Sequence, residues 1–179
     1  MRIKTPILIF AAAVGAFCLA CAGGNTSRVA NMEPPKPKTE GRPSALPNEG
    51  FKAQIALVDP PAKLHAGQNE TIKLHVKNGS SVTWWMRGAE FNPASDNKFY
   101  ITAGYHWLDK DGKRVSGIEG HNAIPKDLKP GEETDMTLQI TAPKDPGEYT
   151  LEADMVQEQV SWFKEKGSPT ATSKVTVVK

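Results

Sequence analysis

Carboxylates and an aromatic ring lie close together in the stretch TLEADMVQEQVSWF, residues 150–163 of this 179-residue chain. Glu152 and Asp154 are one residue apart, Glu158 follows, and Trp162 lies near the end. On a strand, side chains two residues apart share a face and lie about 6.5–7 Å from each other. Glycoside hydrolases place their paired carboxyls roughly 5 to 9.5 Å apart. The spacing is therefore compatible with acid and base catalysis beside a sugar platform.

The same residues also fit an ordinary strand with one face in water. In that case Leu151, Ala153 and Met155 face the core, while Glu152 and Asp154 face solvent. A catalytic acid needs an apolar wall that raises its pKa, and the lysines and threonines of solvated strands supply none. We therefore predict that both carboxylates lie on a solvent-exposed face of the sheet. We also predict that no residue is catalytic and that the protein is not an enzyme.

Tryptophans give the stronger functional lead, because exposed aromatic side chains bind sugar rings and partner proteins. Trp107 and Trp162 are expected in the core of a sandwich without a disulfide. Neighbouring residues on a strand point to opposite faces, so we expect one of Trp84 and Trp85 to face outward. The loop 84–99 is then either a binding edge or an aromatic lid packed on the domain. The candidate binding residues are Trp84, Trp85, Arg87 and Phe91.

Metal ligands and nucleophiles are not indicated by the sequence. Its four histidines lie far apart, without the close spacing of ligand pairs. The tetrapeptide DKDG at 109–112 begins like a calcium loop, but the fifth and twelfth positions are Lys113 and Gly120. We predict a tight turn there, and we expect neither a metal nor a cofactor.

The N-terminus has the layout of a secretory signal, with basic residues before an uncharged run from Pro6 to Ala20. That run is shorter than the roughly 20 residues that span a membrane. Its end, CLAC, resembles the lipobox of bacterial lipoproteins, with Ala20 and Cys21 at matching positions and Cys18 where leucine is preferred. The resemblance implies that Cys21 carries lipid and begins the mature chain. The alternative is cleavage by an ordinary signal peptidase.

Cleavage before Cys21 would change both the charge and the cysteine content. Residues 1–20 hold two of the 22 basic residues and none of the 20 acidic ones, so the mature net charge becomes zero. No basic field then favours nucleic acid, and a single cysteine cannot form an internal disulfide. Ala22 resembles the outer-membrane sorting pattern, so we expect an exported protein in the outer membrane, facing the periplasm or the surface.

Composition divides the mature chain into a linker and one domain. Residues 21–50 hold the lipidated cysteine and a stretch rich in proline, glycine and charge, which we expect to be disordered. From Phe51 to Lys179, short alternating runs bounded by turn residues predict an all-β domain. We expect seven or eight antiparallel strands in an immunoglobulin-like β-sandwich without a disulfide. The expected strands lie at 51–58, 70–78, 99–108, from 113, 134–141, 150–156, 160–163 and 171–178.

Several motifs of this domain resemble an immunoglobulin-like module of bacterial proteins, often appended to enzymes of surface-glycan metabolism. The module is distantly similar to the four-tryptophan domain of autophagy cargo receptors. The resemblance covers Leu74 to the C-terminus. It is carried by Asn78 and Gly79 before Trp84, by the turns Pro130-Gly131 and Pro146-Gly147, and by Trp162. Such modules are spacers or interaction domains without catalytic residues.

Together these features predict a lipid-anchored, non-catalytic envelope protein whose sandwich is an interaction or accessory domain. Its expected partners are the membrane, through the lipid, and an envelope protein or glycan, but not nucleic acid. The alternative is a carbohydrate-binding or hydrolytic protein that uses Trp84 or Trp85 and the face of Glu152 and Asp154.

Overall fold

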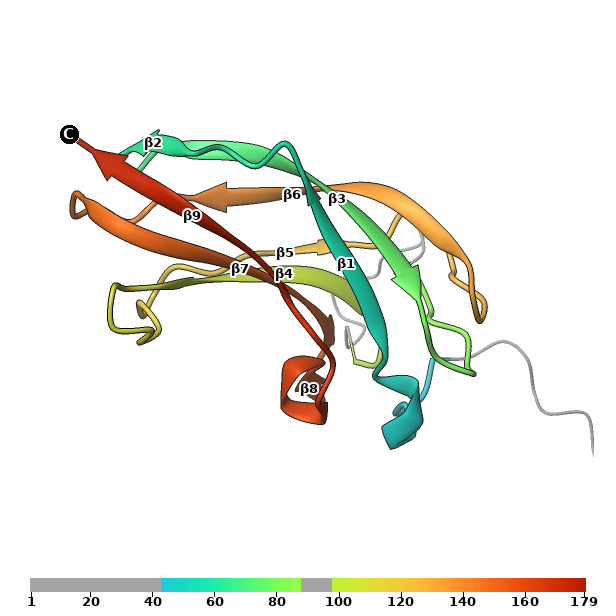
Figure 1. The fold of residues 1–179 in the computed structure, drawn as a ribbon. Coiled ribbons are helices and arrows are strands. Elements are labelled where there is room, and N and C mark those ends of the chain that lie inside the picture. Colours follow the sequence, from blue (N-terminus) through green and yellow to red (C-terminus); the bar gives the residue numbers. More distant parts are fainter. Residues whose placement is uncertain (1–42, 88–97) are drawn as a thin grey trace, which may run out of the picture. The chain divides into compact units, whose positions relative to one another are not determined.

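The computed structural model describes residues 43–87 and 98–179, which form two facing β-sheets (Figure 1). Cys21, Phe91 and the predicted signal lie outside the described residues. None of the described helices is both long and apolar enough to cross a membrane. The elements are β1 Ala53–Val58, β2 Lys63–His65, β3 Asn69–Asn78, β4 Ile101–Leu108, β5 His121–Ala123, β6 Glu133–Thr141, β7 Gly147–Gln157, β8 Ser161–Trp162 and β9 Ala171–Val178, with 3-10 helices η1 Asn48–Gly50 and η2 Lys164–Lys166.

The order of the strands is that of an immunoglobulin sandwich. A three-stranded sheet has the order β1-β3-β6, and a six-stranded sheet has the order β2-β9-β7-β4-β5, with β8 paired to β7. Strands β1, β3 and β6 match A, B and E of that fold, and β4, β7 and β9 match C, F and G. The predicted immunoglobulin-like sandwich is therefore confirmed. Within 43–87 and 98–179, no strand takes the D position beside β6.

The core forms where the alternating apolar residues of both sheets meet, as the sequence predicts. Tyr149, at the start of β7, donates its hydroxyl hydrogen to the carbonyl of Asp145 at 3.0 Å, which is the tyrosine corner of this fold. Two residues later, where antibody domains have a cysteine, the chain has the fully buried Leu151. Trp107 packs edge-on against Tyr149. Side-chain packing thus occupies the region where antibody domains have their disulfide.

Residues 43–50, which composition assigns to the linker, pack against the domain. Gln157 is fully buried; its side-chain oxygen accepts the N–H of Leu46 at 2.9 Å, and its amide donates to the carbonyl of Ser44 at 2.8 Å. The indole of Trp84 donates to the carbonyl of Gly50 at 3.0 Å. Because these buried groups satisfy its backbone, this part of the chain is ordered. The folded part therefore begins before Phe51.

The tetrapeptide at 109–112 forms the predicted turn. One carboxylate oxygen of Asp109 accepts the N–H groups of Asp111 and Lys113, both at 2.9 Å. Gly112 has a φ of 76°, a conformation that glycine adopts without strain. The return strand that we expected from Lys113 is only an isolated bridge between Leu108 and Arg114.

Candidate functional site

Glu152 and Asp154 are buried, which contradicts the prediction that they lie in water. Their side chains face away from the core, as the alternation predicts, but only 4% and 1% of their surfaces are exposed. The reason lies in residues 158–170, which we call the covering segment. The segment pairs with the end of β7 as β8 and places Trp162, Lys164 and Thr170 over the outer face of the six-stranded sheet. This segment contains β8 and η2, which lie at the end of β7 in Figure 1.

Both carboxylates hold the covering segment in place. The ammonium group of Lys164 lies 2.6 Å from a Glu152 oxygen, and the hydroxyl of Thr170 donates to the same oxygen at 3.0 Å. Asp154 accepts the backbone N–H of Lys164 at 3.0 Å and that of Met155 at 2.8 Å. Because Lys164 begins η2, Asp154 satisfies an N–H group that has no partner inside the helix.

Burial raises the pKa of Asp154 to about 6, against the opposing effect of the two N–H groups that it accepts. A carboxyl with such a pKa could exchange a proton near neutral pH. However, each oxygen of Asp154 is already bound to a backbone N–H, and 1% of the residue is exposed. A substrate therefore cannot reach this carboxyl in the conformation described.

Trp162 lies on the outer face of the sheet, and not in the core as predicted. It covers Gly104 so closely that a Cβ atom there would lie 2.6 Å from Trp162 Cη2. Its ring centroid is 3.9 Å from that of His106 and 5.1 Å from that of His121. The residue that enters the core is Phe163, because consecutive residues of the covering segment alternate in direction.

The two histidines beside Trp162 have opposite electrostatic surroundings. Burial and the nearby Arg114 lower the pKa of His106 to about 4. Its Nδ1 atom has no hydrogen-bond partner among the described residues. The hydrogen bond from His121 to Glu158, at 2.8 Å, raises the pKa of His121. Burial acts to raise the pKa of Glu158, but the hydrogen bonds from His121 and Thr102 outweigh it, and this pKa is lowered.

Of the four predicted binding residues, Trp84, Trp85 and Arg87 lie among the described residues. Trp84 is fully buried between the sheets, with backbone hydrogen bonds to Leu128, so it cannot contact a partner. Its neighbour Trp85 is half-buried, as expected for residues that point to opposite faces. Arg87 is also half-buried and lines a cleft of about 260 Å³ with His121 and Glu158. Phe91 lies outside the described residues.

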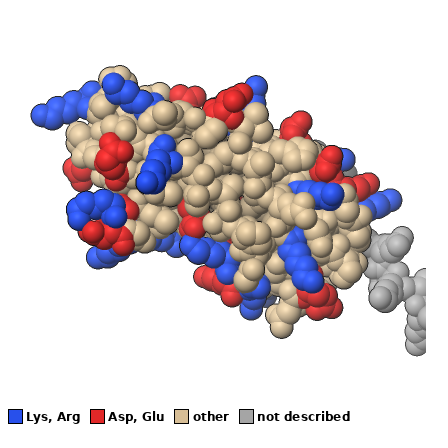
Figure 2. Space-filling model, viewed as in Figure 1, with Lys and Arg blue, Asp and Glu red and all other residues tan. Residues whose placement is uncertain are grey.

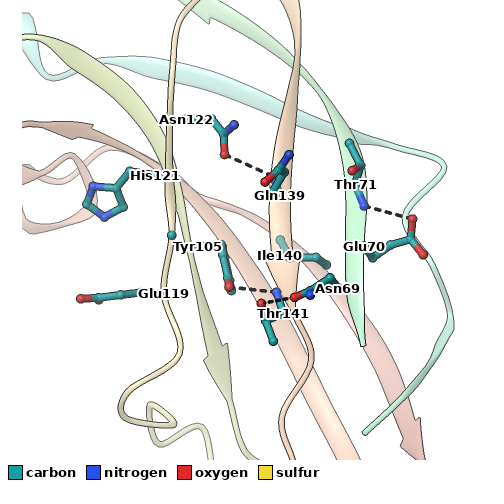
Figure 3. A pocket seen from close by; sticks show the side chains of 11 residues that line it. Asn69, Glu70, Thr71, Tyr105, Glu119, His121, Asn122, Gln139, Ile140 and Thr141 are labelled. Carbon is teal, nitrogen blue, oxygen red and sulfur yellow. Dashed lines mark hydrogen bonds between the residues drawn. The ribbon is translucent and has the colours of Figure 1, made fainter. Parts of the chain in front are cut away.

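A polar groove that the sequence reasoning missed lies beside β6, and we call it the edge groove (Figure 3). It has a volume of about 500 Å³. Residues 119–122, at the start of β5, form one side, and Asn69 and Thr71 of β3 lie on the other. Gln139 and Thr141 of β6 lie between them. The sequence signal was weak, because β5 has only three residues and was not predicted.

Hydrogen bonds fix the edge groove. The backbone N–H of Thr141 donates to the Tyr105 hydroxyl at 2.9 Å, and that of Gln139 donates to the side-chain oxygen of Asn122 at 3.2 Å. The hydroxyl of Thr141 donates to the side-chain oxygen of Asn69 at 2.7 Å. The groove is therefore built from side chains that are already held in position.

Comparison with known proteins finds only distant structural likeness. No protein-family model and no curated protein matches the chain. A CARDB domain from Pyrococcus furiosus, solved with di-metal ions, is 18% identical, with a TM-score of 0.42 over 71% of this chain and 93% of that one. A β-glucosidase from Listeria innocua, solved with glucose, is 14% identical, with a TM-score of 0.43 over 72% of this chain and 16% of the enzyme. The C-terminal domain of Wzt is 12% identical, with a TM-score of 0.43 over 71% of each chain. Likeness at this level carries no argument.

Proposed function

We propose that this chain is a lipid-anchored, non-catalytic protein of the bacterial cell envelope whose sandwich is an interaction or accessory domain. The observation that carries the non-catalytic part is the use of Glu152 and Asp154. Both carboxylates are buried, and both bind the covering segment. They therefore serve the fold rather than a reaction.

One face of the domain carries charges of both signs, which does not favour nucleic acid as a partner. Figure 2 shows lysine and arginine interspersed with aspartate and glutamate over the face in view. A surface with both signs mixed lacks the extended basic field that attracts phosphate backbones. The concave surface that we favour for binding is the edge groove, which is polar and lies on one side of the sandwich.

The anchor is supported by the lipobox-like CLAC and by the spacing between Cys21 and the domain. Residues 22–42 separate the cysteine from the first described residue. A flexible chain of this length has an end-to-end distance of about 25 Å. That distance would hold the domain clear of the lipid headgroups while keeping it near the membrane.

Metabolic labelling in a bacterial host tests the anchor, and the two cysteines of the precursor provide a matched pair of variants. Full-length protein is expressed with an alkyne-tagged fatty acid, and label and membrane fractionation are measured. Cys18→Ser should keep both the label and the membrane fraction, whereas Cys21→Ser should lose both. Label retained in Cys21→Ser would refute the anchor. A hydrolytic activity on envelope glycans that disappears in Glu152→Gln, without loss of stability, would refute the non-catalytic role.

A further inference from the structure

We infer that the edge groove binds a neutral polyhydroxylated ligand, such as a segment of an oligosaccharide. This inference deepens the proposed function and rests on its binding role, whereas anchoring through Cys21 does not depend on it. It rests on three properties of the groove: a sheet edge that is already closed to a strand, a lining of amides, hydroxyls and carboxylates, and the absence of lysine and arginine from that lining.

The edge of β6 cannot take up an extended peptide at this point. Strand addition requires free backbone groups along the edge, but the N–H groups of Gln139 and Thr141 already donate to Asn122 and Tyr105. Tyr105 is 2% exposed, so its hydroxyl does not move aside freely. Gly120 also lets the groove wall pass close to Tyr105, since a Cβ atom there would lie 3.2 Å from Tyr105 Cε1. A ligand must therefore bind through the side chains.

The charge of the lining disfavours an anionic ligand. Glu70 and Glu119 are among the residues that line the groove, and among the described residues no lysine or arginine lines it. Figure 3 shows the side chains of Glu119 and His121 on the far side of residues 119–122 from Gln139, so the histidine ring does not offer a positive charge to the groove. Carboxylate and amide oxygens accept hydrogen bonds from hydroxyl groups, and the amide nitrogens of asparagine and glutamine donate them. The hydroxyls of a neutral sugar present both donors and acceptors, so they match this lining.

A bound metal ion fits the same residues less well. The two oxygens of Glu70 accept hydrogen bonds from the backbone of Thr71 at 3.0 Å and from the amide of Gln68 at 3.1 Å. Glu119 is paired with Arg114. Among the described residues, no group of three acidic, histidine or cysteine side chains is placed to hold a metal ion. The exposed side chain of Gln139, by contrast, is available to a ligand in the middle of the groove.

Saturation-transfer NMR with the full-length protein tests the inference, in a detergent that has no sugar headgroup. The probes are maltotriose, cellotriose and tri-N-acetylchitotriose as neutral ligands, trigalacturonic acid as an anion and trilysine as a cation. We expect saturable binding of at least one neutral trisaccharide and none of the two charged probes. Gln139→Ala removes one hydrogen-bonding side chain, so it should weaken this binding roughly 3- to 10-fold.

Gln54→Ala is the matched control, because Gln54 is an exposed glutamine of β1 in the same sheet, away from the groove. It should leave the affinity unchanged. Binding of only a charged probe, or of no probe, would overturn the inference. So would binding that is insensitive to Gln139→Ala and lost in Trp85→Ala, which would place the ligand at the tryptophan loop. Loss of fatty-acid label in Cys21→Ser is measured in a separate experiment. The proposed anchor and the proposed ligand site can therefore be refuted independently.

Discussion

The buried Asp154 carboxyl should make the domain less stable as the pH rises from about 4 to 6. Its pKa is raised from 3.8 to about 6 in the folded protein, chiefly by burial. Between these two values the folded protein holds a proton that the unfolded chain has released, so the free energy of unfolding falls with rising pH. One pKa unit corresponds to about 1.36 kcal/mol. The loss therefore amounts to at most about 3 kcal/mol and is complete above pH 6.

Asp154→Asn removes this titration and isolates its effect. The stability of the variant at a single pH is not informative, because an asparagine oxygen can accept only one of the N–H groups of Met155 and Lys164. The informative quantity is the free energy of unfolding of the variant minus that of the wild type. This difference should rise by at most about 3 kcal/mol between roughly pH 3.5 and 7.

Urea unfolding of the full-length protein, followed by tryptophan fluorescence, measures this difference at each pH. His106 titrates in both proteins, so its contribution cancels. Asp111→Asn is the control, since the side chain of Asp111 is 70% exposed and keeps its water on folding. The free energy of unfolding of Asp111→Asn minus that of the wild type should change far less with pH. A difference for Asp154→Asn that stays constant or falls with rising pH would refute the reasoning.

Two further predictions concern the residues around Trp162. His106→Gln should act in the opposite direction to Asp154→Asn, because burial lowers the pKa of His106 from 6.5 to about 4 and stability is lost as the pH falls through that window. The difference between variant and wild type in urea unfolding should rise by at most about 3–4 kcal/mol as the pH falls from about 7 to 4, and a difference independent of pH would contradict it. Gly104→Ala places a methyl group 2.6 Å from Trp162, so it should cost about 1–3 kcal/mol and change the tryptophan emission. Unchanged stability and emission would show that Trp162 does not pack on Gly104.

Alternation in the sequence predicts the direction of a side chain but not what covers it. For Ile72, Leu74 and Val76 the direction of the side chain was sufficient to predict burial, because the inward face of β3 meets the core in any sandwich. For Glu152 and Asp154 the direction was right and the exposure was wrong. The covering segment returns to the same sheet after β7. This return depends on tertiary contacts, which the alternation of a single strand does not reveal. A signal was present in Gly104, which stands opposite Asp154 and leaves room for Trp162.

Long-range contacts explain the other differences. Residues 43–50 have the composition of a linker, and their order depends on Gln157, more than 100 residues further along the chain. The doubled tryptophan predicts one side chain on each face, but the sequence does not show that Trp84 is the inner one. The edge groove depends on how β5 and β6 meet, and its short strand gives almost no periodic signal.

The hydrogen bonds of Gln157 also determine how the domain would respond to a mechanical load. A pull on the chain before residue 43 reaches first the bonds from Gln157 to Ser44 and Leu46, then the bond from Trp84 to Gly50. The ladder between β1 and β3 is loaded only after these have broken. Released residues 43–50 would span at most roughly 26–29 Å, and the tether would lengthen by that span minus the distance they cover when docked. The entry segment would thus absorb a brief force, and it could rebind after the force ends while the sandwich stays folded.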